Sequence, residues 1–323
     1  MEYQNTLILP LNDSALFIKF VLLDNLNNTM KKAFFQLHAA IILASFSGIF
    51  GKLITLNEVF ITWYRMLLAS LILIVIFLCK GGKIKLSKNN IQIAALGFIV
   101  GLHWIFFYGS IKYANVSVGV VCFCLSGFFT ALHAPLISKT KLSLNELLLS
   151  IVTLLGIMLI FHFDSSYRTG IIFGIVSALL FSIFVLFNER INTKNEVVNT
   201  TTFQMLGGAI GIGLALPLYL YIYPVSHIVP TPYDFGQLII LALFCTVCMY
   251  LLLNRAQKYI SAFTINLSYN LEPLYSIILA IILFHENREL TTTFYSGLSL
   301  IILSLALQMV RFIVLKKRNT NSL

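Results

Sequence analysis

The sequence predicts an all-α integral membrane protein in which ten transmembrane helices form two inverted five-helix repeats. Three observations support this prediction: the composition, the number of long apolar stretches, and a set of motifs that recurs along the chain. Of the 323 residues, 59% are hydrophobic and 11% are charged, whereas a soluble domain has about 25% charged residues. So few charges cannot cover a globular surface of this size, which excludes a soluble enzyme.

Ten apolar stretches are long enough to cross the roughly 30 Å of hydrocarbon in a bilayer. They lie near residues 35–57, 59–79, 91–112, 115–137, 145–164, 170–188, 201–223, 235–254, 261–284 and 292–313. We expect helices and not barrel strands, because a backbone in lipid must satisfy its own hydrogen bonds and the sequence lacks a barrel's alternating pattern. The connections are short, so the chain should form one membrane domain.

The distribution of Lys and Arg predicts the orientation, because short cytoplasmic loops retain positive charge. With the amino terminus inside, the cytoplasmic segments hold Lys31, Lys32, Lys80, Lys83, Lys85, Lys88, Lys139, Lys141, Arg190, Lys194, Arg255, Lys258, Lys316, Lys317 and Arg318. The opposite side holds Lys112, Arg168 and Arg288 near its loops. We therefore expect a multi-pass protein of the cell inner membrane with both termini in the cytoplasm. Because these Lys and Arg residues are spread over many loops, the net charge of +10 does not require a nucleic-acid partner.

The two ends of the chain lie outside the predicted repeats. Residues 1–34 form an amino-terminal extension that we expect to be dispensable, because the apolar run from Leu16 to Leu23 is too short to span and has no signal-peptide features. Met30, just before Lys31 and Lys32, is an alternative to Met1 as the start of translation. An interfacial amphipathic helix is the functional alternative for the extension. Residues 314–323 form a basic cytoplasmic tail.

Three short motifs recur in the same order and indicate an internal duplication. Phe46-Ser47 recurs as Phe181-Ser182, Asn57-Glu58-Val59 as Asn195-Glu196-Val197, and Lys112-Tyr113 as Lys258-Tyr259. The offset between copies grows steadily along the chain, as expected for a duplicated unit with a few insertions. The predicted repeats cover residues 35–164 and 170–313. Because each would contain five spans, the second has the opposite orientation, which is an architecture of secondary transporters.

Another group of motifs lies in and after the ninth span. Its members are Leu271-Glu272-Pro273, Glu286, Leu290-Thr291 and Gly297. This group resembles the second-repeat signature of EamA-type transporters of the drug/metabolite transporter superfamily, over roughly residues 35–313. Two departures are His285, where the family usually has glycine, and Ser126-Gly127, where the first repeat would have Glu-Pro. The resemblance implies a transporter that exports or exchanges small metabolites, often amino acids or related compounds, across the cytoplasmic membrane.

Glu272 is the first candidate for the substrate or ion pathway. It lies about halfway along the ninth span, where a carboxylate costs several kcal/mol unless it is paired, hydrated or protonated. Pro273 should kink the helix at this point, because it removes a backbone donor. Tyr269, Asn266 and Asn270 make the same span polar, so we include them in the pathway. The alternative is that Glu272 is a structural carboxylate that locks this span to a neighbour.

The second group of candidates comes from the second and third spans. His103 and Trp104 lie at mid-depth, and Trp104 shares a helix face with Tyr108, which suits an aromatic wall with a polar edge. Arg65 could hold a substrate carboxylate. Packed core aromatics are the alternative for the third span, and snorkelling to the surface is the alternative for Arg65 and for Lys52, with Glu58 as a partner.

Metals, cofactors and nucleotides are not expected. Cys245 and Cys248 have a CxxC spacing, but no cluster in the sequence completes a zinc site, and Gly48 to Lys52 lacks the spacing of a phosphate-binding loop. The predicted function is therefore non-enzymatic alternating-access transport driven by a gradient. Its partners would be the lipid bilayer, a small-molecule substrate and a coupling proton; the sequence does not indicate an oligomeric state. The alternative is an integral membrane enzyme that acts on a lipid-linked substrate.

Overall fold

Every regular element in the described part of the chain is a helix. A computed structural model describes residues 13–138, 144–161, 167–192, 194–269, 271–288, 290 and 292–320. In chain order the elements are α1 (Asp13–Leu53), α2 (Glu58–Cys79), α3 (Lys88–Tyr113), α4 (Val116–Phe123), α5 (Leu125–Ser138), α6 (Leu144–Phe161), α7 (Arg168–Asn192), α8 (Val197–Ile222), α9 (Pro232–Ala242), η2 (Leu243–Cys248), α10 (Met249–Ala256), α11 (Ala262–Tyr269), α12 (Glu272–Phe284), η3 (Glu286–Arg288) and α13 (Thr292–Thr320). η2 is a π-helix and η3 is a 3-10 helix.

Seven segments within the described residues are long and apolar enough to cross a membrane, against ten predicted. They are Asn28–Leu53, Glu58–Cys79, Lys88–Tyr113, Val116–Ile137, Arg168–Asn192, Val197–Ile222 and Pro232–Ala256. Glu272–Phe284 and Thr292–Ser304 are shorter apolar helices, and the predicted fifth span is helical as α6 up to Phe161. Residues 162–164 of that span lie outside the described residues. The protein is a multi-pass membrane protein.

The predicted fourth and ninth spans are each divided into two helices. α4 and α5 meet at Cys124, and α11 ends at Tyr269 before α12 begins at Glu272. The ends of α4 and α11 lie as far apart in sequence as the Lys112-Tyr113 and Lys258-Tyr259 motifs. The sequence predicted the kink near Pro273. It did not predict the interruption at Cys124, because the first repeat has no proline there.

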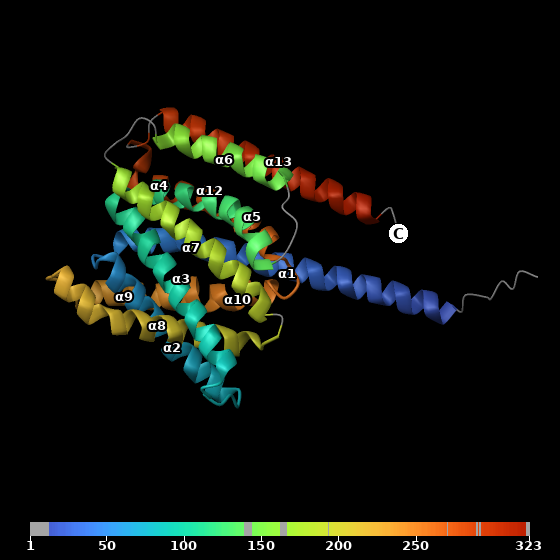
Figure 1. The fold of residues 1–323 in the computed structure, drawn as a ribbon, viewed down its shortest axis with the longest axis horizontal. Coiled ribbons are helices and arrows are strands. Elements are labelled where there is room, and N and C mark those ends of the chain that lie inside the picture. Colours follow the sequence, from blue (N-terminus) through green and yellow to red (C-terminus); the bar gives the residue numbers. More distant parts are fainter. Residues whose placement is uncertain are drawn as a thin grey trace, which may run out of the picture.

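Contacts between a helix of one half and a helix of the other recur between the equivalent helices with the two halves swapped. α1 contacts α10 as α7 contacts α3, and α1 contacts α12 as α7 contacts α5. α3 packs on α8 as α2 packs on α9, and the last helices of the halves, α6 and α13, lie side by side along one edge of the bundle (Figure 1). Two copies of one helical unit that are related by a twofold axis produce this exchange.

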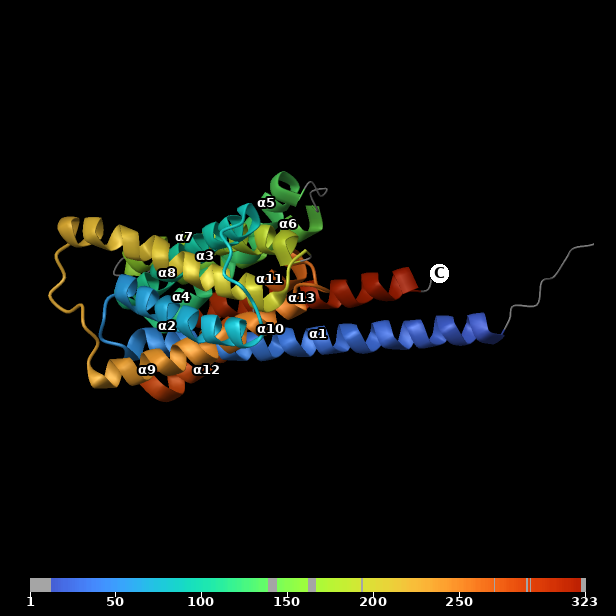
Figure 2. The same ribbon diagram turned by 90° about the horizontal axis from the view of Figure 1, so that it is seen from below.

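The bundle has two ends, which we name after nearby lysines. The Lys52 end holds the end of α1, the start of α4 and the end of α12. The Lys83 end holds the end of α2, the end of α7 and the start of α11. α1 and α13 both extend past the other helices in the same direction (Figure 2). α1 is continuous from Asp13, so no break separates the first span from the part of residues 1–34 that the structure describes.

Small residues let α3 and α8 approach closely in the middle of the bundle. A methyl group added at Gly97 would lie 1.8 Å from the backbone oxygen of Gln204, and one added at Gly207 would lie 2.2 Å from that of Ala94. Small residues commonly permit such contacts between membrane helices, where packing replaces the hydrophobic effect. α3 carries several cavity residues, so this contact fixes part of the site.

Gly97→Ala should destabilise the protein, because α3 and α8 must separate to accommodate the methyl group. We expect a loss of about 1–3 kcal/mol, the usual cost of overpacking, seen as a lower melting temperature of the purified protein in detergent. Gly236→Ala in α9 is the control, since a methyl group there meets no atom within 4 Å. Equal melting temperatures for Gly97→Ala and the wild type would contradict the close contact.

Candidate functional site

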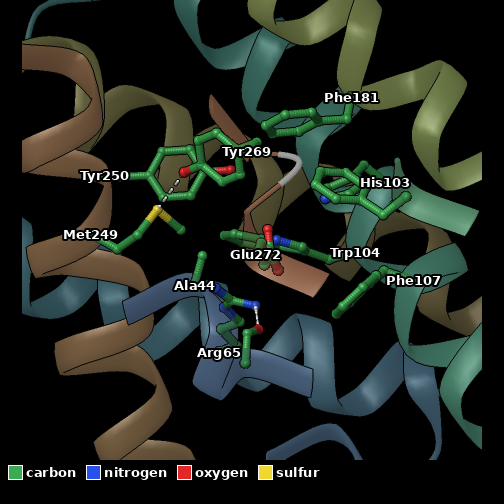
Figure 3. Close-up of a pocket in the computed structure, with 12 residues that line it drawn as sticks. Ala44, Arg65, His103, Trp104, Phe107, Phe181, Met249, Tyr250, Tyr269 and Glu272 are labelled. Atoms are coloured by element: carbon green, nitrogen blue, oxygen red, sulfur yellow. Dashed lines mark hydrogen bonds between the residues drawn. The ribbon is translucent and has the colours of Figure 1, made fainter. Parts of the chain in front are cut away.

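A cavity lies between the two halves of the chain, at the level of the interrupted helices (Figure 3). Its walls come from α1, α2, α3, α4, α7, α10, α11 and α12, through Ala44, Ser47, Arg65, His103, Trp104, Phe107, Phe123, Phe181, Met249, Tyr250, Tyr269 and Glu272. The volume that the centre of a water molecule can occupy in this cavity is about 30 Å³. A cavity that holds one water needs roughly 10–15 Å³ of such volume. In this conformation the cavity therefore has room for two or three water molecules and not for an amino acid.

Arg65 is fully buried and is held by neutral acceptors from three other segments. Its Nε donates to Thr246 Oγ1 at 2.7 Å, and its Nη2 donates to the Cys245 carbonyl at 2.6 Å. Its Nη1 donates to Ser47 Oγ at 2.9 Å and to the Tyr108 hydroxyl at 2.6 Å. These contacts use four of the five N–H groups of a guanidinium. Snorkelling to the surface, the alternative for Arg65, is wrong.

Trp104 and the π-helix η2 complete the surroundings of Arg65. The guanidinium carbon lies 3.6 Å from the centre of the Trp104 ring, a cation–π contact worth up to about 2 kcal/mol when it is shielded from water. η2 supplies both Thr246 and Cys245, and short π segments inside membrane helices often mark functional sites. Neither the π segment nor its two contacts to Arg65 could be seen in the local sequence pattern.

Glu272 brings a carboxyl group to the same cavity. It is buried in the first turn of α12, where the helix dipole favours a carboxylate. Among the described residues, no hydrogen bond and no ion pair within 4.0 Å engages its carboxylate. Figure 3 shows Glu272 at the centre of the group, with Arg65 on one side and Tyr269 on the other. A buried cation and a buried carboxylate therefore line one cavity without forming an ion pair.

Aromatic side chains form the remaining walls. His103 Nδ1 lies 2.8 Å from Ser177 Oγ and 3.0 Å from the Ser177 carbonyl, so α7 orients the imidazole. The His103 ring centre is 5.0 Å from that of Phe181 and 5.4 Å from that of Phe123. The cavity thus combines a guanidinium and a carboxyl group with flat apolar surfaces, a combination that suits a small amphipathic ligand.

The predicted site residues occupy different places. Glu272, Tyr269, His103, Trp104 and Arg65 line the cavity. Tyr108 lies behind Arg65, because its hydroxyl bonds to the guanidinium and to Ser47. Asn266 points to α5, where it donates to Thr130 Oγ1 at 2.7 Å. Asn270 lies outside the described residues. Ser47 and Phe181, which the duplicated Phe-Ser motif contains, belong to the cavity although the sequence did not identify them as site residues.

Comparisons with known proteins agree with this geometry. The model of the EamA-like transporter family matches residues 31–162 and 168–310. The chain belongs to the EamA-like transporter family. The two matched regions confirm the resemblance noted in the sequence, and they show that the family's domain is duplicated here.

Individual relatives of this EamA-like protein are also transporters by name. "Uncharacterized transporter YyaM" of Bacillus subtilis strain 168 is 25% identical over 229 residues, which cover 68% of this chain and 74% of that protein. An "Uncharacterized transporter" of Clostridium kluyveri is 24% identical over 277 residues, which cover 80% of this chain and 88% of that protein. A solved crystal structure shares the fold, with a TM-score of 0.63 and 15% identity over 87% of this chain and 97% of that one.

In this EamA-like protein, buried carboxylates close the Lys52 end. Glu286 is fully buried and accepts hydrogen bonds from Lys52 Nζ at 2.9 Å, from the backbone N–H groups of Val116 and Ser117 at 3.2 and 3.1 Å, and from Ser117 Oγ at 2.6 Å. It therefore ties α1 and α12 to the first turn of α4. Lys52 therefore pairs with the family-motif carboxylate Glu286 and not with Glu58, the partner that the snorkelling alternative gave it.

A second buried carboxylate stabilises the same end. Asp234, at the start of α9, accepts from the Thr55 backbone N–H at 2.8 Å and from the Thr55 hydroxyl at 2.7 Å. It also accepts from the Thr231 backbone N–H at 3.4 Å, and the Asp234 backbone N–H donates to the Thr231 hydroxyl at 3.1 Å, so the two residues form a capping box at the start of α9. Lys112 donates to the Ile54 carbonyl nearby. The loop between α1 and α2 is thus fixed to α9 and α3.

Neutral amides join the helices at the Lys83 end. The buried cluster comprises Asn188 and Asn192 of α7, Thr201 and Gln204 of α8, Asn254 of α10, and Gln257 just after α10. Asn254 Oδ1 accepts from both α7 asparagines at 2.9 and 2.8 Å, and Gln204 donates to Asn188 at 2.6 Å. The sequence did not predict this cluster, because its members lie at the ends of apolar runs, where polar residues usually face water.

Glu286→Gln should weaken the Lys52 end, because the amide loses the charge that Lys52 and the first turn of α4 require. Hydrogen bonds to charged groups contribute about 1.5–3 kcal/mol, so we expect a clearly lower melting temperature in detergent. Glu196→Gln is the control, since Glu196 is exposed and makes no capping hydrogen bond at the start of α8. Equal losses for the two variants would contradict the assigned role of Glu286.

Proposed function

We propose that this protein is a secondary transporter that exports a small zwitterionic metabolite, an amino acid or related compound, by alternating access. The observation that carries the proposal is the pair of opposite charges, Arg65 from the first half and Glu272 from the second, that line one cavity without an ion pair. The names of the relatives favour transport over the alternative of a membrane enzyme.

A zwitterion matches both charges of the cavity. Its carboxylate would take the remaining N–H of Arg65, and its ammonium group would donate to Glu272. Each interaction would replace water around a buried charged group. In the low dielectric of the protein interior, such an interaction is stronger than in water, so it would increase the affinity for a matching ligand. Trp104 and Tyr250 would pack against the apolar part of the ligand. Glu272 or His103 would also be the group that carries a coupling proton.

The two closed ends support an occluded state within an alternating-access cycle. The cavity is too small for an amino acid as it stands, so binding requires the helices around it to separate at one end. The interrupted helices α4/α5 and α11/α12 meet the cavity from opposite halves, as inverted-repeat transporters require. We further propose ten spans in repeats 35–164 and 170–313, a dispensable extension 1–34, and a basic tail 314–323.

Transport can be measured in proteoliposomes loaded with an equimolar mixture of the twenty standard amino acids. We expect at least one amino acid to appear outside faster than from protein-free liposomes, by mass spectrometry of the medium. Glu272→Gln should slow this efflux at least tenfold at equal incorporation, because the amide cannot pair with an ammonium group or carry a proton. Glu196→Gln, an exposed carboxylate away from the cavity, should transport like the wild type.

Two results would contradict the proposal. Efflux of none of the twenty amino acids from liposomes with correctly folded protein would exclude standard amino acids as substrates. Efflux at the wild-type rate by Glu272→Gln would remove this carboxylate from the mechanism. Arg65→Lys adds a further comparison: it keeps the charge but loses the planar set of donors, so we expect slower transport and lower stability together.

We propose that the protein lies in the inner membrane of the cell and that its Lys83 end faces the cytoplasm. Single cysteines at Lys83 and His227, in a variant without the five native cysteines, would report it. An impermeant thiol reagent added to intact cells should label the His227 position and leave the Lys83 position unlabelled. The reverse pattern would overturn the orientation that the loop charges predict.

A further inference from the structure

A groove opens between α3 and α7 at the Lys83 end, away from the central cavity. About 470 Å³ of it is open to the centres of water-sized molecules, many times the space in the central cavity. Its polar rim contains Asn89, Gln92, Arg190, Lys194 and Asn195. The two helices that form it also carry cavity residues, which lie further along both helices from the groove.

The rim of the groove is positively charged. Arg190 lies in the last turn of α7 and Lys194 in the turn that follows, and both are exposed. Asn89 donates to the Asn195 side chain at 2.8 Å, which joins the start of α3 to this turn. Glu189 points elsewhere, because its carboxylate accepts from the Ala262 backbone N–H at 3.1 Å. The rim thus carries two exposed cationic side chains together with several amide groups.

The inner part of the groove is apolar. Ala95, Leu96 and Ile99 of α3 face Phe187 and Ile191 of α7 in its walls. Phe187 lies one helical turn before Arg190, and Ile99 lies about two turns after Gln92, so the apolar walls extend from the charged rim toward the middle of the membrane. A soluble anion would use the rim alone, whereas an amphiphile with an anionic head would use both parts.

We propose that this groove binds an anionic phospholipid, with its phosphate at Arg190 and Lys194 and an acyl chain along Ala95, Ile99 and Phe187. Basic pockets between membrane helices are typical sites for anionic headgroups, and guanidinium groups bind phosphate oxygens with strong, charge-assisted hydrogen bonds. The bound lipid would hold α3 against α7. This proposal depends on the membrane location of the chain and not on the transported substrate.

Native mass spectrometry of the full-length protein can test the site with phosphatidylglycerol as the probe. We expect one phosphatidylglycerol molecule to stay bound to the wild type at activation energies that remove phosphatidylcholine. Arg190→Gln/Lys194→Gln should weaken this binding at least fivefold. The matched control is Lys80→Gln/Lys83→Gln, which removes two exposed lysines from the same end outside the groove, and it should bind like the wild type.

A second variant tests the apolar half of the groove. Ala95→Trp keeps both cations but fills the space of the acyl chain, so it should also lose phosphatidylglycerol. Inorganic phosphate at millimolar concentration should not compete, because it cannot use the apolar walls. Equal binding by the Arg190/Lys194 variant and its control would overturn the proposal, as would equal retention of phosphatidylcholine. Competition by phosphate, or undiminished binding by Ala95→Trp, would replace it with a site for soluble anions.

Discussion

The burial of the Arg65 guanidinium is the constraint on which the centre of this protein depends. Removing such a cation from water costs several kcal/mol, and only well-placed acceptors offset that cost. Here the acceptors come from both halves of the chain: Ser47 and Tyr108 from the first, and Thr246 and the Cys245 carbonyl from the second. The halves cannot separate at this level without leaving a buried charge unsatisfied, so Arg65 acts as the joint between them.

The charges of the cavity do not follow the symmetry of the helices. The helices that bear Arg65 and Glu272 have counterparts in the opposite half, but the recurring motifs align Arg65 with Phe203 and Glu272 with Ser126. Each half therefore contributes one charge that its partner lacks. The two halves share one arrangement of helices, and residues at non-equivalent positions place an arginine and a carboxyl group in the cavity. Helices that are related by the duplication but carry different side chains in the cavity can distinguish the two ends of an asymmetric ligand.

The sequence predicted the helical fold, the duplication and most of the cavity's polar residues, because each leaves a local signal. A long apolar stretch indicates a membrane span. An ionisable residue such as Glu272 or Arg65 is conspicuous inside such a stretch, because burying it in the membrane costs free energy. The contact of Lys52 with Glu286 leaves no such signal, since its partners are 234 residues apart. The interruption at Cys124 was also missed, because no proline or glycine-proline signal marks that position in the sequence. Tertiary contacts decide these features.

The two ends of the bundle are closed by different chemistry, carboxylates at one and neutral amides at the other. Two identical halves would give a protein whose two open forms have equal free energy. Unlike closures remove that equality, and a difference of only about 1.4 kcal/mol already changes the ratio of two conformations tenfold. The resting population would then be biased before any ligand or gradient acts. The free energies of the two closures would then set which form predominates at rest, while the gradients would still set the direction of net flux.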